Sequence, residues 1–297
     1  MAIANVLVVG SGTMGNGIAQ ICAQAGLSVT MTDVSSDVVA KGRAAIEKSL
    51  AKMVEKAKLT SDARDQALAR ITTGTDVEGN AKNADLVVEA VPERMDLKLA
   101  LFRTVSAAAP AHAILATNTS SLSVTEIASA TRDPSRVVGL HFFNPVPVME
   151  LLEIVRGMST SDATIEIARA FGKTIGKKEI VVKDVAGFAT SRLGVILGCE
   201  AMRMLEQGVA SAEDIDRAME LGYRHPMGPL KLTDLVGLDV RLAILDHLTK
   251  ELGEQFRPPA LLRQMVRAGR LGRKSGRGFY TYDSSDGSAP LPQRAKE

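Results

Sequence analysis

Histidine is the side chain best suited to accept a hydroxyl proton near neutral pH. The chain has four of them, at His112, His141, His225 and His247. His141 ends the apolar run 137–142, and ligands of α/β proteins bind at the carboxyl ends of buried strands. The other three stand among small apolar residues, beside a proline or within a helical stretch, where packing or surface roles explain them. We therefore predict that His141 is a general base.

Glu153 is the predicted partner of His141. Pro145 and Pro147 lie between the two residues and favour a turn that folds the following strand back. A carboxylate brought beside the imidazole in this way would fix its tautomer and stabilise its cation. Such a pair removes the proton of an alcohol while hydride leaves the carbon. Taken alone, the residues leave open a simpler interpretation, a core histidine and an unrelated surface glutamate.

Three glycines at GxGxxG spacing indicate a dinucleotide site. They directly follow the apolar run 5–9 and precede a helical stretch, which is the context that this motif requires. The first glycine allows a tight turn, the second lets the backbone approach a pyrophosphate, and the third lets helix and strand pack closely. The expected cofactor contacts of the loop are Gly10, Gly12, Thr13, Met14 and Gly15.

Asp33 favours NAD as the dinucleotide. It follows the second apolar run, 28–32, where a carboxylate accepts hydrogen bonds from the ribose hydroxyls. A 2′-phosphate would meet this carboxylate as a like charge, and no arginine follows immediately to compensate. The alternative for Asp33 is a turn-capping role.

The elements around these residues predict an α/β fold with a Rossmann-type, doubly wound sheet. Short aliphatic runs alternate with helix-period stretches through the first half of the chain. The predicted strands are 5–9, 28–32, 86–91, 113–117 and 137–142. An apolar stripe from Val39 to Ala57 predicts a long amphipathic helix, and its other side carries the basic residues Lys48, Lys52 and Lys56.

An all-helical C-terminal domain, 184–297, is predicted to follow an NAD-binding domain, 1–183. Strand-like runs stop near Lys183, and helical periodicity marks 189–207 and 211–221. Ser211 and Asp214 form a predicted capping box, and Gly222 is placed where a helix would end in a left-handed residue. The tail, 284–297, is rich in Ser, Gly, Pro and charge, which predicts poor order.

Composition excludes several classes of protein. With 45% hydrophobic and 24% charged residues, the chain is typical of a soluble globular protein. Lys and Arg number 36 against 34 Asp and Glu, so no charge excess indicates nucleic acid, and no run of 18 apolar residues indicates a membrane span. Cys22 and Cys199 fit neither a zinc spacing nor a disulfide framework, so we expect both to be buried and no metal to bind. The cytoplasm is favoured, with an organelle matrix left open.

Longer strings carry a family resemblance that spans nearly the whole chain. In the first half they are EAVPE at 89–93, NTSS at 118–121 and LHFFNPVPVMELLE at 140–153. In the second half they are HPMGP at 225–229, DLVGLD at 234–239 and GRKSGRGFY at 272–280. Together they resemble the short, single-function 3-hydroxyacyl-CoA dehydrogenases.

The resemblance implies reversible, NAD-dependent oxidation of (S)-3-hydroxyacyl-CoA to 3-oxoacyl-CoA by the pair His141 and Glu153. It also implies a homodimer. Ser120 is implied to lie near the reacting oxygen, and the implied contacts of the nicotinamide half are Glu93, Lys98, Ser120 and Asn144, with Lys274 as a further cofactor contact. The alternatives are strand-end capping for Ser120 and Asn144, and solvated surface positions for the other three.

The lysine stripe is a candidate site for coenzyme A. Its positive charges could meet the phosphates of the coenzyme, and the resemblance points to Ser49 and Lys56 as substrate-binding residues. A lysine stripe is equally well explained as a solvated helix face.

Two residues depart from the family pattern. Where the family reads PGFxxNR, this chain has Ala186 in place of the proline and Ser191 in place of the asparagine. Ser191 can donate a hydrogen bond to the substrate oxygen, but it lacks the second polar group of an amide. Either a water fills the gap or the pocket takes a differently placed acyl chain.

Two other functions stay open. A dehydrogenase of a free 3-hydroxy (sugar) acid would use the same cofactor half and the same histidine and glutamate, and saturation by acyl-CoA would separate the two activities. A non-catalytic relative would bind NAD(H) without turnover, although His141 and Glu153 are both retained. A bifunctional hydratase–dehydrogenase is not expected, because 297 residues leave no room for a second enzyme domain.

Overall fold

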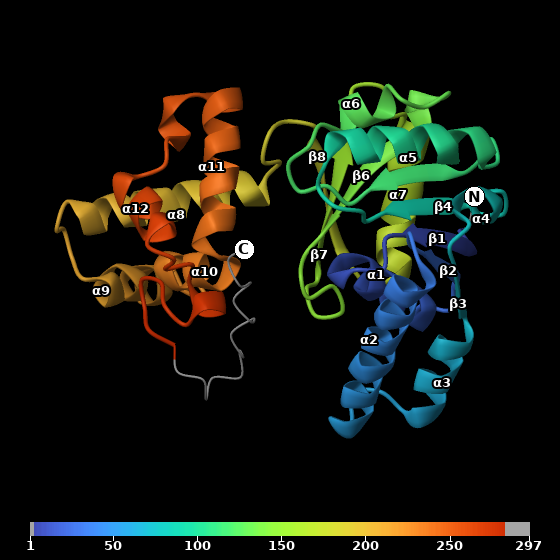
Figure 1. Ribbon diagram of the computed structural model, residues 1–297, viewed down its shortest axis with the longest axis horizontal. Coiled ribbons are helices and arrows are strands. Elements are labelled where there is room, and N and C mark those ends of the chain that lie inside the picture. The colour runs from blue at the N-terminus through green and yellow to red at the C-terminus, as the bar shows by residue number, and fades with distance from the viewer. Residues whose placement is uncertain (1–2, 283–297) are drawn as a thin grey trace, which may run out of the picture. The chain divides into compact units, whose positions relative to one another are not determined.

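The computed structural model describes residues 3–282 of the chain (Figure 1). The chain divides into two compact units, Met1–Val185 and Ala186–Glu297. The first is a sheet flanked by helices and the second is helical, so the predicted fold class is confirmed. The tail for which poor order is predicted, 284–297, lies outside the described residues.

An eight-stranded sheet forms the centre of the first unit, in the order β3-β2-β1-β4-β5-β6-β7-β8. Its strands are β1 (Asn5–Val9), β2 (Ser28–Thr32), β3 (Ile71–Gly74), β4 (Leu86–Glu89), β5 (Ile114–Thr117), β6 (Val137–Phe142), β7 (Leu151–Arg156) and β8 (Lys178–Lys183). The strands β1 to β6 are parallel, β7 is antiparallel to β6, and β8 is parallel to β7. The strand order reverses between β1 and β4, which is where α/β sheets of this kind bind ligands.

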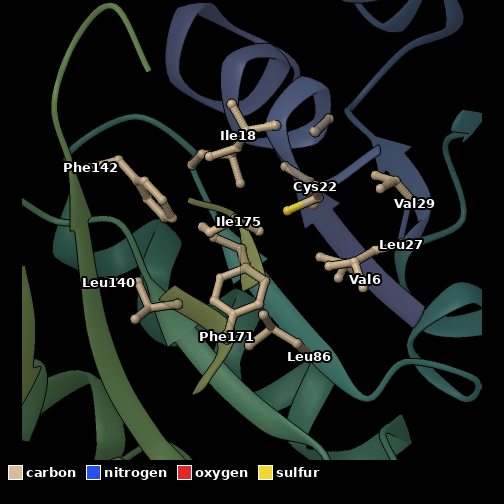
Figure 2. Packing of buried hydrophobic residues seen from close by; sticks show 14 of the residues in the cluster. Val6, Ile18, Cys22, Leu27, Val29, Leu86, Leu140, Phe142, Phe171 and Ile175 are labelled. Atoms are coloured by element: carbon tan, nitrogen blue, oxygen red, sulfur yellow. The ribbon is translucent and has the colours of Figure 1, made fainter. Parts of the chain in front are cut away.

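Helices cover both faces of this sheet. They are α1 (Thr13–Gln24), α2 (Ser36–Glu55), α3 (Ser61–Ala69), α4 (Val77–Ala81), α5 (Met95–Ala108), α6 (Val124–Ala128) and α7 (Asp162–Thr174). Five of them begin at a side chain that accepts a backbone hydrogen bond, namely Ser35, Thr60, Asp76, Ser123 and Ser161. Figure 2 shows Ile18 and Cys22 of α1 with Phe171 of α7 in one apolar cluster over the sheet. The helices α4, α5 and α6 pack against the opposite face.

Three predicted strands match the observed bounds, and two are longer in the prediction than in the structure. β4 ends at Glu89 because the Val91 N–H turns back to the Glu89 side chain, 2.8 Å away, instead of continuing the ladder. β5 begins at Ile114. β3 was not predicted, since it is a short edge strand whose Thr72 and Thr73 are exposed. The long amphipathic helix is confirmed as α2, but it ends at Glu55, and Ala57 lies beyond it with a φ of 52°.

The second unit has its own apolar core. Its helices are α8 (Thr190–Glu206), α9 (Ala212–Arg217), α10 (Pro229–Val236), α11 (Leu238–Leu252) and α12 (Ala260–Arg267). Ser211 caps α9 by accepting from the Asp214 N–H, as predicted. The prediction for Gly222 is wrong: α9 continues into a π-helical turn, 218–222, and the left-handed residue is Arg224, with a φ of 59°.

The two cysteines, Cys22 and Cys199, are buried, as expected. No helix within residues 3–282 is both long enough and apolar enough to cross a bilayer.

Candidate active site

The turn between β1 and α1 has the geometry of an anion-binding loop. Gly10 has a φ of 103°, and a Cβ on Gly15 would collide with the Gly10 carbonyl oxygen. A Cβ on Gly12, by contrast, would point into open space, and no side chain of the described residues caps the start of α1. The first turn of α1 consists of Thr13, Met14 and Gly15. Its backbone N–H groups can therefore bind a pyrophosphate.

The carboxylate of Asp33 is held beside this loop at the carboxyl end of β2. Its Oδ2 accepts hydrogen bonds from the Ser11 N–H at 2.7 Å and the Ser11 hydroxyl at 2.9 Å. Its Oδ1 accepts from the Val34 N–H at 2.7 Å. Asp33 is only half-buried, so the carboxylate can also reach a ligand. The open glycine loop and this carboxylate fit the pyrophosphate and the adenosine ribose of NAD.

A buried cluster of charged residues follows β4. The side chain of Lys98, on α5, is completely buried, and its Nζ lies 2.6 and 2.8 Å from the two carboxylate oxygens of Glu89. The same Nζ lies 3.2 Å from the Glu93 Oε2. Besides Lys98 and the Val91 N–H, Thr117 also donates a hydrogen bond to Glu89, at 2.6 Å. These partners offset the cost of burying the lysine charge.

Glu93 shapes the loop that carries Ser120. Its Oε1 accepts from the Thr119 hydroxyl at 2.6 Å, from the Ser120 N–H at 2.9 Å and from the Ser120 hydroxyl at 3.4 Å. Burial raises the pKa of Glu93, but the Lys98 cation and these hydrogen bonds outweigh it, so the pKa lies below its usual range. Glu93 is thus ionised at neutral pH and holds Ser120 at the end of β5.

His141 and Glu153 are cross-strand partners in the antiparallel pair β6 and β7. Directly opposed residues point to the same face of a sheet, which explains why their side chains meet. The His141 Nδ1 lies 2.7 Å from the Glu153 Oε2, with His141 7% exposed and Glu153 fully buried. The Asn118 Oδ1 accepts from the Phe142 N–H at 2.9 Å and so links the loop of Ser120 to the end of the strand of His141.

Lys177 holds the loop between β6 and β7 in place by hydrogen bonds. This lysine is buried, and its Nζ donates hydrogen bonds of 2.6 Å to the carbonyl oxygens of Val146 and Met149. Burial lowers the pKa of the ammonium group. Asn144 lies in the same loop and is exposed.

A cavity of about 470 Å³ lies between α2 and this loop. It is lined by Ser49, Lys52, Met53, Lys56, Lys58, Pro145, Pro147 and Val148. The residues expected to bind coenzyme A, Ser49 and Lys56, thus meet the loop that follows His141. Lys48, which the sequence places in the same basic stripe, does not line the cavity.

The two remaining site residues belong to the second unit. Ser191 lies in the first turn of α8 and is half-buried. Lys274 forms an ion pair with Asp239, and its Nζ lies 2.6 Å from the Asp239 Oδ2. The packing or surface roles expected of His112 and His247 agree with the structure, since His112 contacts Asp85 at 3.2 Å and is half-exposed and His247 is partly buried. His225, beside Pro226, is also partly buried.

Sequence reasoning missed Glu89 and Lys177. Glu89 is the last residue of an apolar run. A carboxylate at such a position is expected to be buried, as Glu89 is, and a buried carboxylate needs a cation as its partner. Lys98 follows Glu89 by nine residues, and this spacing places two side chains together neither on a helix nor on a strand. The pairing can therefore be seen only in the folded structure. Lys177 precedes another lysine and gives no signal of burial.

Comparison with known proteins yields full-length matches. The family model described as 3-hydroxyacyl-CoA dehydrogenase, NAD binding domain, matches residues 5–185, and the C-terminal domain of the same family matches residues 187–282. A 3-hydroxybutyryl-CoA dehydrogenase of Bradyrhizobium diazoefficiens is 43% identical over 98% of this chain and 99% of its own length. The mitochondrial hydroxyacyl-coenzyme A dehydrogenase of Sus scrofa is 42% identical over 94% of this chain and 91% of its own.

A solved structure is similar over the same extent. The (S)-3-hydroxybutyryl-CoA dehydrogenase of Ralstonia eutropha has a TM-score of 0.92 and 45% identity, covering 95% of this chain and all of that chain. The match of the first unit to an NAD-binding domain confirms the cofactor expected from Asp33.

Proposed function

The chain belongs to the 3-hydroxyacyl-CoA dehydrogenase family, and on that premise we propose that it oxidises (S)-3-hydroxyacyl-CoA to 3-oxoacyl-CoA reversibly, with His141 as general base. The observation that carries the assignment of the base is the 2.7 Å contact between the His141 Nδ1 and the Glu153 Oε2 at the end of β6. A buried carboxylate beside an imidazole is the arrangement that proton transfer from an alcohol needs.

The proton transfer follows from the geometry of this pair. The Glu153 carboxylate can only accept, so the Nδ1 of neutral His141 carries the hydrogen and its Nε2 is the basic atom. Nε2 takes the proton of the 3-hydroxyl, and Glu153 stabilises the imidazolium that results. Ser120 donates a hydrogen bond to the same substrate oxygen, and Ser191, at the position of the family asparagine, is proposed to do the same. NAD held by the residues below would supply the acceptor for the hydride that leaves C3.

The cofactor would be held by three groups of residues. The glycine loop from Gly10 to Gly15 binds the pyrophosphate, and Asp33 binds the adenosine ribose. Glu93, Ser120, Asn144 and Lys274 are proposed for the nicotinamide half. Lys98 is completely buried between two carboxylates, so we propose that it supports this half by holding Glu93 in place.

The substrate would use the cavity between α2 and the loop after β6. Ser49 and Lys56 line it, and their hydroxyl and ammonium groups suit the phosphates of coenzyme A.

Residues 1–183 are the proposed NAD-binding domain, and 184–297 are proposed to bind the acyl group and form a homodimer. On α8, Leu193 and Leu197 are exposed one turn apart, as a surface covered by a second copy would be. Two free, buried cysteines suit a reducing compartment such as the cytoplasm.

The test is NADH consumption with acetoacetyl-CoA, run in parallel with NADPH and with the variant His141→Ala. We expect turnover with NADH that falls by about 10²–10⁴ in the variant. NADH binding without turnover would support a non-catalytic relative. Turnover of free 3-oxo acids, without saturation by acyl-CoA, would support the sugar-acid dehydrogenase.

A further inference from the structure

Glu89 is a fully buried carboxylate outside the residues proposed for catalysis. It ends β4, and each of its two oxygens accepts two hydrogen bonds. Oε1 accepts from the Val91 N–H at 2.8 Å and from the Lys98 Nζ at 2.6 Å. Oε2 accepts from the Thr117 hydroxyl at 2.6 Å and from the same Nζ at 2.8 Å. Donors from the loop after β4, from α5 and from β5 therefore fix this carboxylate.

The ion pair of Glu89 and Lys98 is costly for a fold to keep. Both side chains are completely buried, and two charges must leave water to form the pair. An apolar pair of similar volume often stabilises a protein as well or better. Stability alone therefore does not account for this ion pair.

Lys98 links the fixed carboxylate of Glu89 to Glu93. An ammonium group has three hydrogens, and two of them are directed to Glu89. The third can meet the Glu93 Oε2, which lies 3.2 Å from the Nζ. The Glu93 side chain is 36% exposed, so packing confines it only in part. Within residues 3–282, Lys98 is the one cation that pairs with it.

Glu93 holds the loop of Ser120 with its other oxygen. The Glu93 Oε1 accepts from the Thr119 hydroxyl at 2.6 Å and from the Ser120 N–H at 2.9 Å. The Ser120 hydroxyl lies 3.4 Å from the same oxygen, which is long for a hydrogen bond between oxygens. The loop is thus held by its backbone and by Thr119, while the Ser120 hydroxyl is free to turn to a substrate.

We propose that Glu89 is a positioning residue for Ser120. It acts through Lys98 and Glu93, and this rests on the proposed function, in which Ser120 donates to the oxygen that gives its proton to His141. Without the charge of Glu89, the ammonium group of Lys98 pairs with Glu93 alone and shifts the carboxylate that holds the loop. A misplacement of about 1 Å near the reacting atoms can lower a rate by about 10²-fold. The rate is affected rather than acyl-CoA binding, because none of these residues lines the cavity proposed for coenzyme A.

The experiment is a double-mutant cycle in the full-length enzyme with NADH and acetoacetyl-CoA. The wild type, Glu89→Gln, Ser120→Ala and the double variant are compared in kcat and in the KM for acetoacetyl-CoA. We expect kcat to fall by about 10²–10³ in Ser120→Ala. In Glu89→Gln it falls by at least about tenfold, while the KM stays within about threefold of the wild type. In the Ser120→Ala background, Glu89→Gln lowers kcat by less than about threefold, because the residue through which it acts is already absent.

Asp85→Asn is the matched control. Asp85 lies just before the other end of β4, and its carboxylate accepts from the N–H groups of Ala4 and Asn5. Thermal unfolding is measured for every variant, and Asp85→Asn lowers the melting temperature but keeps kcat. If Glu89→Gln is unfolded at the assay temperature, Glu89→Asp takes its place in the cycle under the same criteria, because it keeps the charge but withdraws it from Lys98.

An unchanged kcat in Glu89→Gln overturns the proposal. So does a loss of the same size in the Ser120→Ala background, which would show that Glu89 acts elsewhere, or an equal loss in Asp85→Asn, which would show an effect of the fold. A wild type inactive with acetoacetyl-CoA would instead overturn the proposed function. A Ser120→Ala variant as fast as the wild type would remove Ser120 from that function and would overturn the inference with it.

Discussion

The imidazole of His141 and the carboxylate of Glu153 lie 2.7 Å apart as directly opposed residues of β6 and β7. β7 is the first strand of the sheet to run against its neighbour, and this reversal makes the pairing possible. In a parallel pair the chain would need a long crossover between the two residues. Here a loop of eight residues, 143–150, suffices.

Removing the charge of Glu153 tests whether it acts through His141. In Glu153→Gln the amide cannot stabilise the imidazolium, so we expect kcat to fall by about 10²–10⁴ while the KM for NADH stays nearly unchanged. Steady-state kinetics measure both. The control is Glu150→Gln, an exposed carboxylate in the adjacent loop that pairs with Lys178. Equal losses in the two variants would contradict a specific role for Glu153.

The cavity predicts different roles for two lysines of one helical stripe. Lys56 lines it and Lys48 does not, so Lys56→Ala should raise the KM for acyl-CoA and Lys48→Ala should leave it unchanged. Neither change should alter the KM for NADH. The assignment of Lys56 fails if its removal affects both substrates alike, or if both variants behave in the same way.

Asp33 should set the choice between NADH and NADPH. Asp33→Asn removes the like-charge repulsion of a 2′-phosphate but keeps an oxygen that can accept from Ser11. The ratio of kcat/KM for NADH to that for NADPH should fall by about tenfold or more. Asp37→Asn, in the first turn of α2, is the matched control. An unchanged ratio in Asp33→Asn would show that other residues exclude NADPH.

Lys177 should position one wall of the proposed substrate cavity. Lys177→Met leaves the Val146 and Met149 carbonyls without their donor, so we expect a lower melting temperature and a higher KM for acyl-CoA. The neighbouring Lys178 is exposed, and Lys178→Met should change neither quantity. If Lys177→Met melts earlier but binds acyl-CoA normally, the lysine serves only the stability of the fold.

Neither cysteine should react in the folded protein. Burial raises the pKa of the Cys22 thiol to about 12, so at pH 8 only about one molecule in 10⁴ carries the thiolate. Burial also raises the pKa of Cys199. A chromogenic disulfide reagent should therefore detect no thiol before denaturation and two after it. Rapid labelling of the native protein would show that one of these regions opens readily.

Local pattern predicts much of this fold and of its candidate site. Apolar runs, glycine spacing and proline positions identify β1, β2, β6, the candidate cofactor loop and the approach of Glu153 to His141. These features depend on residues that are close in sequence, or on a strand that pairs with the strand directly before it, as β7 does with β6. The edge strand β3 has no such signal, because its exposed threonines also suit a loop.

Contacts between distant residues are what sequence does not provide. The burial of Lys98 between Glu89 and Glu93, and of Lys177 under two carbonyl oxygens, depends on which elements meet in space. The π-helical turn at 218–222 also has no sequence signal. Because of it, the left-handed residue is Arg224 and not the predicted Gly222.

In the hairpin of β6 and β7, the strands hold His141 against Glu153, and the loop between them forms one wall of the cavity. A deletion of one residue within β7 would turn Glu153 to the other face of the sheet and abolish its contact with His141. Insertions in the loop 143–150 would instead reshape the wall formed by Pro145, Pro147 and Val148 while the strand register stays fixed. Changes of loop length can therefore alter the proposed substrate cavity during evolution or engineering, whereas the proposed proton-transfer pair tolerates no shift of register.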